Sequence, residues 1–448
     1  MTETKQRFPK TFWTANTIEL FERAAYYAMA SFVVIYLNEN LGMSPSKATF
    51  INGTFLWGSI YFLPILSGAL ADKFGFKKSL SVAFILISIG YLIMGNLQRL
   101  WPGIIGRDAA EAVDFTVPVV LGVVLIGIGG SIVKPCIAGT VQKTAGTRAT
   151  LAFGIFYMVI NIGSITGRSV SYFIRTSLGI PAIFTYVASL FALVGLIITL
   201  FVYREPAFVS DGKKDGQTVQ KRTLGQALFG IVTVLSNLKF VFLIIVLSLF
   251  WFLYIQLYNL MPLFMRYVDP NAPMELYTLA NPLMIVCFQL LITRWVKRWT
   301  PVKSIMLGAV VVTLGMFINV LPTLFFSDIT QKVHIGLAVP IAGIFLLVSI
   351  ASMAVGEMMA SPRVYEYIGA IAPRGQEGLY LGYQSLPIAL ASIVGGRLGG
   401  KLFERYISNP VKADLPPGLT TMWLIIVGIG VASIVGLYIY DRNVAKAK

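Results

Sequence analysis

The chain has 448 residues, of which 56% are hydrophobic and only 12% are charged, and its mean hydropathy is +0.76. A soluble domain carries about 25% charged residues, so this composition excludes a soluble globular protein and is typical of an integral membrane protein. The formal net charge of +16 could by itself indicate a nucleic-acid-binding protein. The placement of the basic residues favours a membrane protein instead, and we expect no nucleic-acid partner.

Apolar segments of about 17–25 residues, each long enough to cross the hydrocarbon core of a bilayer, recur along the chain. We place twelve of them at residues 11–38, 48–71, 79–97, 116–141, 150–175, 180–203, 239–265, 276–298, 303–325, 335–360, 378–403 and 418–441. Residues 1–10 contain no small-residue cleavage site, so we expect the first segment to be retained. This pattern predicts an all-α membrane protein with twelve transmembrane helices.

Basic residues gather in every second loop. The richer loops cover residues 72–78, 142–149, 204–222, 294–303 and 363–374, and the intervening loops hold fewer Lys and Arg. This positive-inside asymmetry predicts that both termini are cytoplasmic. Together with the compact loops and the missing targeting segment, it indicates a multi-pass protein of the plasma membrane, in particular of a bacterial inner membrane.

One long polar stretch, residues 204–237, divides the chain near its middle. We therefore predict an N-terminal six-helix bundle at 1–203, a cytoplasmic linker at 204–237 and a C-terminal six-helix bundle at 238–448. In carriers that are built from two such halves, the binding site lies between them near the bilayer midplane.

The first apolar segment contains charged residues at helical spacing. Glu19, Glu22, Arg23, Tyr26 and Ala30 fall on one face of a helix with 3.6 residues per turn. An ionisable side chain at membrane depth costs at least about 2.5–3.5 kcal/mol, so three on one face indicate a water-filled cavity with charged partners. The alternative is that both glutamates lie shallow and extend to the headgroups.

Chemistry other than transport has few candidate residues. The single histidine, His334, is expected at the surface, and Cys136 and Cys287 lie in apolar segments, where a free thiol behaves as a small hydrophobe. An enzyme would need a nucleophile with its base, or a set of metal ligands. We therefore expect no enzymatic activity, no metal site and no disulfide.

The loop after the second span carries the first family motif. Residues 68–78, Gly-Ala-Leu-Ala-Asp-Lys-Phe-Gly-Phe-Lys-Lys, resemble the motif G-x-x-x-D-[KR]-x-G-x-[KR]-[KR] of the major facilitator superfamily. Asp72 can cap or pair at a helix end, Gly75 permits a tight turn, and Lys73 and Lys77 can bind anionic lipid. The resemblance implies the major facilitator fold and a gating role for Asp72, Lys73 and Lys77.

Within that superfamily, five stretches resemble the proton-dependent oligopeptide transporter family. Residues 19–27 match its first-helix signature E-x-x-E-R-F-x-Y-Y, except that Ala24 replaces Phe, and residues 156–164 match F-Y-x-x-I-N-x-G-S. The shorter matches are Lys134-Pro135, Asn281-Pro282, and Gly356-Glu357 with Ser361-Pro362. The resemblance implies a secondary active transporter that moves small peptides together with protons by alternating access.

The resemblance also assigns the two ends of a zwitterionic peptide to different side chains. Two cations would hold its carboxylate, two amides and a carboxylate would hold its amino end, and three tyrosines would line the pocket. The two cations are Arg23 and Lys134, the two amides and the carboxylate are Asn161, Asn281 and Glu357, and the three tyrosines are Tyr26, Tyr27 and Tyr61. For the two asparagines the alternative is hydrogen bonding between helices, and for Tyr61 it is ordinary packing.

Proton coupling would follow from competition for the same cations. Deprotonated Glu19 or Glu22 pairs with Arg23 or Lys134, and protonation releases the cation to the substrate. Protons are thus the coupling ion, and no cofactor is expected. We expect a monomer in the lipid bilayer, with a di- or tripeptide as its small-molecule partner.

The chain departs from the family at one ion pair between the two halves. Family members usually carry an Arg where this chain has Ala30, and a Glu where it has Ile255. Losing both leaves no orphan charge, but that pair is thought to couple protonation to the extracellular gate. Arg168 is an additional charge that either compensates on the cavity wall or extends outward. The departures leave open a second function: a carrier of a non-peptide anionic or amphipathic solute, either a symporter or a facilitator that works without protons.

Overall fold

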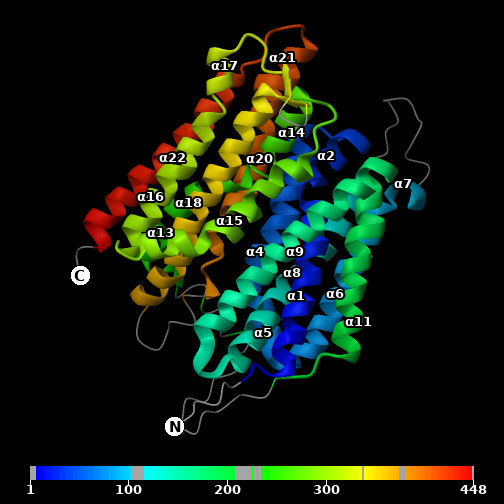
Figure 1. The fold of residues 1–448 in the computed structure, drawn as a ribbon, viewed down its shortest axis with the longest axis vertical. Coiled ribbons are helices and arrows are strands. Elements are labelled where there is room, and N and C mark those ends of the chain that lie inside the picture. The colour runs from blue at the N-terminus through cyan, green and yellow to red at the C-terminus, as the bar shows by residue number, and fades with distance from the viewer. Residues whose placement is uncertain are drawn as a thin grey trace. The chain divides into compact units, whose positions relative to one another are not determined.

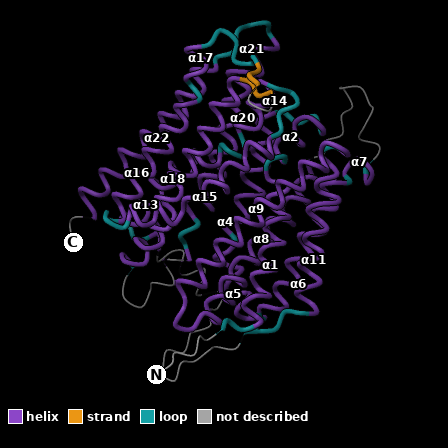
Figure 2. The backbone as a smooth tube through the Cα atoms, in the orientation of Figure 1, coloured by secondary structure: helices purple, strands orange, loops and turns teal. Residues whose placement is uncertain are grey.

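The computed structural model describes residues 7–101, 116–206, 234–334, 338–372 and 382–445, together with Gly225, Gly230 and Tyr380. Nearly all of these residues are helical (Figures 1 and 2). Ten of the described helices are long and apolar enough to cross a membrane, and two further pairs, each bent by 41°, raise the number to twelve when each pair counts as one span. The bent pairs are Lys10–Ala30 with Val33–Asn40, and Pro45–Phe62 with Pro64–Ala71. The predicted all-α membrane fold is confirmed.

Contacts between the helices divide the chain into two compact units. Unit 1 comprises Met1–Met29 and Leu63–Phe229, and unit 2 comprises Ala30–Phe62 and Gly230–Lys448. Residues 30–62 thus pack with the C-terminal half, whereas the sequence assigns them to the bundle at 1–203. The predicted division into two six-helix bundles stays a prediction, and most of the predicted linker at 204–237 lies outside the described residues.

Unit 1 is packed through small residues. In it α6 lies against α8 and α11, and α5 lies against α8. A Cβ on Gly90 would lie 2.7 Å from the Gly122 carbonyl oxygen, and one on Gly129 would lie 2.6 Å from that of Ala83. Glycine therefore lets the backbones of α6 and α8 approach closely, as is common between helices in lipid. The elements are α1 (Lys10–Ala30), α5 (Pro64–Phe74), α6 (Phe76–Gly95), α7 (Leu97–Leu100), α8 (Thr116–Ala145), η4 (Gly146–Arg148), α9 (Ala149–Leu178), α10 (Ile180–Ala182), η5 (Ile183–Ala188) and α11 (Ser189–Phe201).

In unit 2, α16 packs against α18 and α22, and α15 packs against α18 (Figure 1). The helix α20 packs against α13 and against α3, η2 and α4. Its core includes the fully buried Trp423, whose ring meets that of Phe264 at 5.2 Å. The elements of the first two spans are α2 (Val33–Ile35), η1 (Tyr36–Asn40), α3 (Pro45–Phe50), η2 (Ile51–Trp57) and α4 (Gly58–Phe62). The later helices are α13 (Leu238–Ile255), α14 (Leu260–Val268), α15 (Met274–Val296), α16 (Pro301–Ile318), α17 (Leu321–Phe325), α18 (Ile341–Ile371), α20 (Leu386–Phe403), η6 (Glu404–Ser408), α21 (Asn409–Lys412), α22 (Leu419–Tyr440) and η7 (Asp441–Ala445).

Several helix ends follow from local sequence. Ser44, Asn237 and Thr300 cap α3, α13 and α16 by accepting a hydrogen bond from the backbone N–H three residues later. Gly75 separates α5 from α6 with φ of 90°, and Gly179 ends α9 with φ of 82°. Both angles lie in the region that favours glycine, so the sharp turns at these positions depend on it.

The structure differs from the predicted elements around the tenth span. Residues 332–334 and 338–340 form a short antiparallel hairpin, β1 (Lys332–His334) and β2 (Ala338–Pro340), which appears as the two strands in Figure 2. The span predicted at 335–360 begins only at Ile341, because Pro340 lies at its N-cap, and it continues to Ile371. His334 is exposed, as predicted, but on a strand rather than at a helix entrance.

Candidate functional site

The charged residues of α1 form one buried cluster in unit 1. The side chain of Arg23 donates from its Nε to Oε2 of Glu22, and the same Nε lies 3.4 Å from Oε1 of Glu19. The exposed fractions are 0% for Glu19, 3% for Glu22 and 7% for Arg23. Side chains buried to this degree are enclosed by protein, which favours the buried cluster over the alternative in which both glutamates extend to the headgroups.

Lys134 of α8 completes the charge balance of this cluster. It interacts electrostatically with Glu19, and its side chain is only partly buried. Two carboxylates and two cations are therefore neutral together when all four are ionised. A buried cluster of this kind changes its net charge whenever it takes up a proton or an anion, which links the two events through Coulomb interaction.

Aromatic rings extend the cluster to Arg168. The Arg23 guanidinium lies 5.3 Å from the ring centroid of Tyr26, whose ring meets that of Tyr27 edge to face at 5.2 Å. The Arg168 guanidinium lies 4.6 Å from the ring centroid of Tyr27 and donates to Oγ of Ser164. Arg168 is 1% exposed, so it does not extend outward, and a cation–π contact offsets part of its desolvation.

Small residues of α9 place these side chains close to α1. A Cβ on Gly163 would lie 2.7 Å from the Leu20 carbonyl oxygen, and one on Gly167 would lie 2.2 Å from that of Ala24. One turn further, Ser171 donates its Oγ to the Ala28 carbonyl oxygen at 3.0 Å. Gly163, Gly167 and Ser171 are spaced four residues apart, so they lie on one face of α9. Contacts from this face fix the position of α1 along α9.

Asn161 lies on the same helix and is 5% exposed. Its Nδ2 donates to the Tyr157 carbonyl oxygen at 2.9 Å, one turn back along α9. This bond lies within one helix, so it does not supply the interhelical alternative considered for Asn161.

Glu357 is the acceptor of a second polar cluster, in unit 2. Nδ2 of Asn281 in α15 donates to Oε2 of Glu357 in α18 at 3.2 Å, and the hydroxyl of Tyr254 in α13 donates to the same carboxylate. Three helices thus converge on one acid that has neutral donors. Asn281 therefore joins two helices, as expected if its role were hydrogen bonding between helices. Its partner, however, is a carboxylate that a cation could also bind.

Tyr61 belongs to an aromatic ladder in the same unit. Its ring stacks on Trp57 at 5.6 Å, Trp57 meets Tyr258 at 4.7 Å, and Tyr258 meets Tyr254 at 6.3 Å. Sequence reasoning missed Trp57, Tyr254 and Tyr258. Their pairwise spacing of four residues, Trp57 with Tyr61 and Tyr254 with Tyr258, is the signal that could have indicated two aromatic helix faces.

Residues 31–52 are joined to the later helices of unit 2 by a set of hydrogen bonds that we call the polar seam. Ser31 Oγ and Thr278 Oγ1 lie 2.8 Å apart, and Asn52 Nδ2 donates to Asn259 Oδ1 at 3.0 Å. In the two remaining hydrogen bonds, Nε of Arg266 donates to Oε1 of Glu39 at 2.6 Å, and the backbone N–H of Ser46 donates to Oε1 of Glu404 at 2.9 Å.

The position of the missing family ion pair is apolar and closed. Ala30 is 1% exposed and Ile255 is 0% exposed. Each position has a neutral hydrogen bond of the polar seam close to it in the sequence. Ser31, which bonds Thr278, directly follows Ala30, and Asn259, which bonds Asn52, lies four residues after Ile255. Joint loss of the two charges thus leaves packed side chains at both positions.

The predicted gating residues are only partly described. The structure gives the backbone of Asp72 within α5, but its side chain lies outside the described part. Lys73 Nζ lies 5.3 Å from the centroid of the Phe74 ring, and the backbone N–H of Lys77 donates to Oε1 of Glu205 at 2.6 Å. Glu205 therefore provides a carboxylate at the N-terminus of α6, where the helix dipole favours negative charge. Sequence reasoning missed this acid.

Comparisons with known proteins agree with this architecture. Residues 18–338 match the family model of the Major Facilitator Superfamily. The chain is 24% identical to dipeptide and tripeptide permease A of Escherichia coli (strain K12), covering 88% of this chain and 84% of the relative. It is 25% identical to dipeptide and tripeptide permease B of Salmonella typhimurium, covering 87% and 86%.

A solved structure of a POT family transporter in complex with 5-aminolevulinic acid superposes with a TM-score of 0.74 at 18% identity, covering 98% of this chain and 96% of the other. At that identity the superposition shows the fold. Together, these findings confirm the resemblance to major facilitator proteins and to their proton-dependent oligopeptide transporters that the motifs predicted.

Proposed function

Because the chain belongs to the major facilitator superfamily, we propose that it is a secondary active transporter that carries di- or tripeptides across the membrane together with protons. The observation that carries the proposal is the buried cluster of Glu19, Glu22 and Arg23 on α1. Three ionisable side chains at membrane depth are costly unless they serve ion or substrate movement. The similarity to dipeptide and tripeptide permeases along most of the chain supports the substrate class.

The chemistry of the two clusters suits the two ends of a peptide. Arg23 can bind a carboxylate through two parallel hydrogen bonds once it leaves Glu22, and Lys134 adds a second cation. Glu357 already accepts hydrogen bonds from neutral donors, and an ammonium group would supply a charged one in their place. In the aromatic ladder Trp57 and Tyr258 are buried and Tyr61 is half-buried, so Tyr61 offers the ring face on which a substrate side chain can pack.

Proton coupling follows from the shared partner of the two glutamates. While Glu22 is ionised it accepts the Nε hydrogen bond of Arg23, so a substrate carboxylate must compete with it. Protonation of Glu22 removes that competition and keeps the cluster neutral when the substrate carboxylate enters. One proton that moves through 100 mV supplies about 2.3 kcal/mol, which supports about fifty-fold accumulation.

Alternating access requires the polar seam to open and close. By the positive-inside rule the seam lies toward the extracellular side, with both chain termini in the cytoplasm and the protein in a bacterial inner membrane. Opening on that side would separate residues 31–52 from Thr278, Asn259, Arg266 and Glu404.

We further propose that the carrier works as a monomer, has no enzymatic activity, and uses no cofactor apart from protons.

The test is uptake of radiolabelled dialanine into proteoliposomes in which the pH gradient and the membrane potential are set separately. We expect Glu22→Gln to abolish uptake driven by the pH gradient and to retain exchange of internal for external dialanine. The control is Asp414→Asn, which removes an exposed carboxylate at a positive φ that Asn tolerates. Unchanged pH-driven uptake in Glu22→Gln would remove Glu22 from the coupling step.

One observation favours a second candidate function. Ala30 and Ile255 are packed and uncharged, so the link that is thought to couple protonation to the extracellular gate in the family is missing. A carrier of a non-peptide anionic or amphipathic solute that ignores protons would show uptake independent of the pH gradient and no competition by dialanine. Competition by dialanine together with a requirement for the pH gradient supports peptide symport instead.

A further inference from the structure

The end of α15 and the start of α16 carry a group of cations with no acid among them in the sequence, and Glu366, the acid that lines the adjacent cavity, is paired with Arg363. The basic end, as we call it, consists of Arg294, Lys297, Arg298 and Lys303, and residues 294–303 contain no Asp or Glu. All four residues are exposed. In the part of the chain that the structure describes, none of the four makes an ion pair with a carboxylate.

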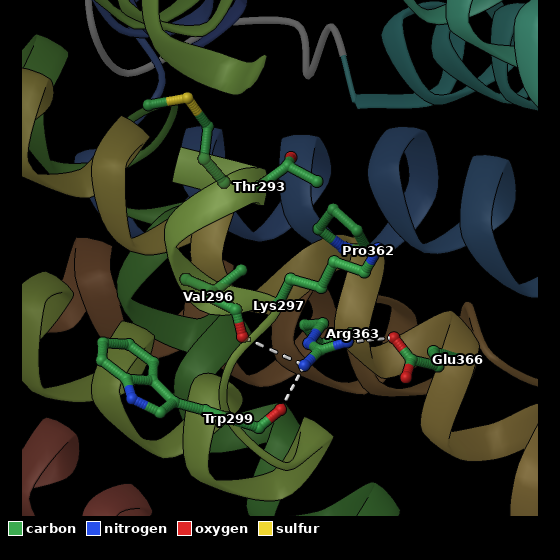
Figure 3. A pocket seen from close by; sticks show the side chains of 8 residues that line it. Thr293, Val296, Lys297, Trp299, Pro362, Arg363 and Glu366 are labelled. Carbon is green, nitrogen blue, oxygen red and sulfur yellow. Dashed lines mark hydrogen bonds and ion pairs between the residues drawn. The ribbon is translucent and has the colours of Figure 1, made fainter. Parts of the chain in front are cut away.

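A cavity of about 470 Å³ opens beside the basic end, between α15 and α18 (Figure 3). Arg363 of α18 forms part of its wall and is already engaged. Its guanidinium donates to the carbonyl oxygen of Val296 at 3.1 Å and to that of Trp299, and it pairs with Glu366. Arg363 therefore caps the last carbonyls of α15 and is not the cation that a ligand would use.

Lys297 is the cation available at this cavity. Its side chain lines the cavity and runs from α15 toward Pro362 of α18 in Figure 3. Among the described residues no carboxylate forms an ion pair with Lys297, so within that part of the chain it can bind an anion without first giving up an ion pair. Volumes of about 300–1,000 Å³ are typical of small-molecule sites, so the cavity has room for a phosphate group with its glycerol ester.

The surroundings of the cavity change from charged to apolar along α15. Trp295 is 51% exposed, and its ring meets that of Trp299 at 4.8 Å. One to two turns earlier, Leu290 is 79% exposed and Leu291 is 65% exposed, and Leu290 shares a face with Lys297 seven residues later. Exposed indole rings between cations and leucines are typical of the membrane–water interface.

We propose that the basic end binds an anionic phospholipid. Its phosphate binds Lys297 in the cavity with Arg294 or Arg298 alongside, its glycerol region lies against Trp295, and its acyl chains lie along Leu290 and Leu291. Leu290, Leu291 and Trp295 place the basic end at the membrane–water interface, where lipid phosphates lie at the depth of its cations, so the charge and the apolar surface together favour a lipid. Basic pockets between transmembrane helices bind such headgroups elsewhere.

The test is the association of spin-labelled phosphatidylglycerol with the intact protein in phosphatidylcholine vesicles, compared with spin-labelled phosphatidylcholine. The wild type should prefer phosphatidylglycerol. Each cation near an anionic lipid contributes about five-fold in binding, so Lys297→Gln/Arg298→Gln should reduce the preference by at least about five-fold. The control Lys401→Gln/Lys412→Gln removes the same charge from exposed positions on α20 and α21 and should leave the preference unchanged.

Two further measurements keep the proposal falsifiable. Lys297→Arg keeps the charge and should retain the preference for phosphatidylglycerol, which separates loss of a cation from loss of folding. An equal fall in both double variants would show a non-specific effect of net charge and would overturn the proposal. So would full displacement of the labelled lipid by inorganic phosphate, because a free anion would then account for the site.

Discussion

A close contact with backbone atoms lies beside the polar seam at Gly53, where η2 meets α20. A Cβ at this position would lie 2.2 Å from the Ser392 carbonyl oxygen and 2.8 Å from the Cα of Gly396. Both are backbone atoms, so no side-chain rotation relieves the clash. Overpacking of this kind costs about 1–3 kcal/mol in the closed arrangement only. At 1.4 kcal/mol per decade, Gly53→Ala should shift the seam toward its open form by about five- to 150-fold.

Opening can be measured at a cysteine buried beside the seam. Thr49 is 0% exposed, so Thr49→Cys should react slowly with a membrane-impermeant maleimide while the seam is closed. The assay uses oriented proteoliposomes and a background in which Cys136→Ala and Cys287→Ser remove the native thiols. Because labelling of a buried thiol proceeds through the open form, its rate should rise in Gly53→Ala by the same five- to 150-fold.

The matched control is Gly428→Ala on α22, since a Cβ there meets nothing within 4 Å. It introduces the same methyl group into unit 2 and should leave the labelling rate unchanged. If Gly53→Ala and Gly428→Ala label at equal rates, then residues 31–52 do not move away from α20, and the seam is a fixed part of unit 2 rather than a gate.

Three further outcomes are expected. Glu404→Gln weakens the hydrogen-bond acceptor for Ser46 and should raise the rate of Thr49→Cys labelling several-fold. A buried hydrogen bond to a charged group contributes about 1.5–3 kcal/mol, and the contribution is smaller at this partly exposed site. Asn281→Ala removes a donor to Glu357 and should raise the KM for dialanine about ten-fold or more with a smaller change in maximal rate, as steady-state uptake would show. Gly167→Ala should lower the thermal unfolding midpoint in detergent, whereas Gly154→Ala, whose Cβ meets nothing within 4 Å, should not.

Much of the site could be predicted because its charged residues lie on one helix. Glu19, Glu22 and Arg23 are neighbours at helical spacing, so the helical period alone brings them to one face. The same local reasoning left Arg168 undecided, because its position depends on the Tyr27 ring of another helix. The resemblance assigns Asn281 and Glu357 to the same end of the substrate, but no pattern in the residues predicts the hydrogen bond between them.

Glu205 and Trp57 show where local patterns are insufficient. Glu205 follows α11 in a polar stretch, and nothing near it in sequence indicates that its carboxylate caps α6. Trp57 reads as one more aromatic in an apolar span, although it joins Tyr61 to Tyr258. Both roles depend on helices that are distant in the chain, which a period of 3.6 residues cannot report.

The sequence by itself determined the class of protein, the spans and the face of α1 that carries charge. These are local properties, since hydrocarbon thickness sets the length of an apolar run and the helical repeat sets its faces. Only the tertiary structure decided that residues 30–62 pack with the C-terminal half, and that Ala30 and Ile255, the positions of the missing ion pair, are both buried. Close approach of Gly53 to Gly396 requires two complementary surfaces from remote segments, and that match exists only after the helices have packed.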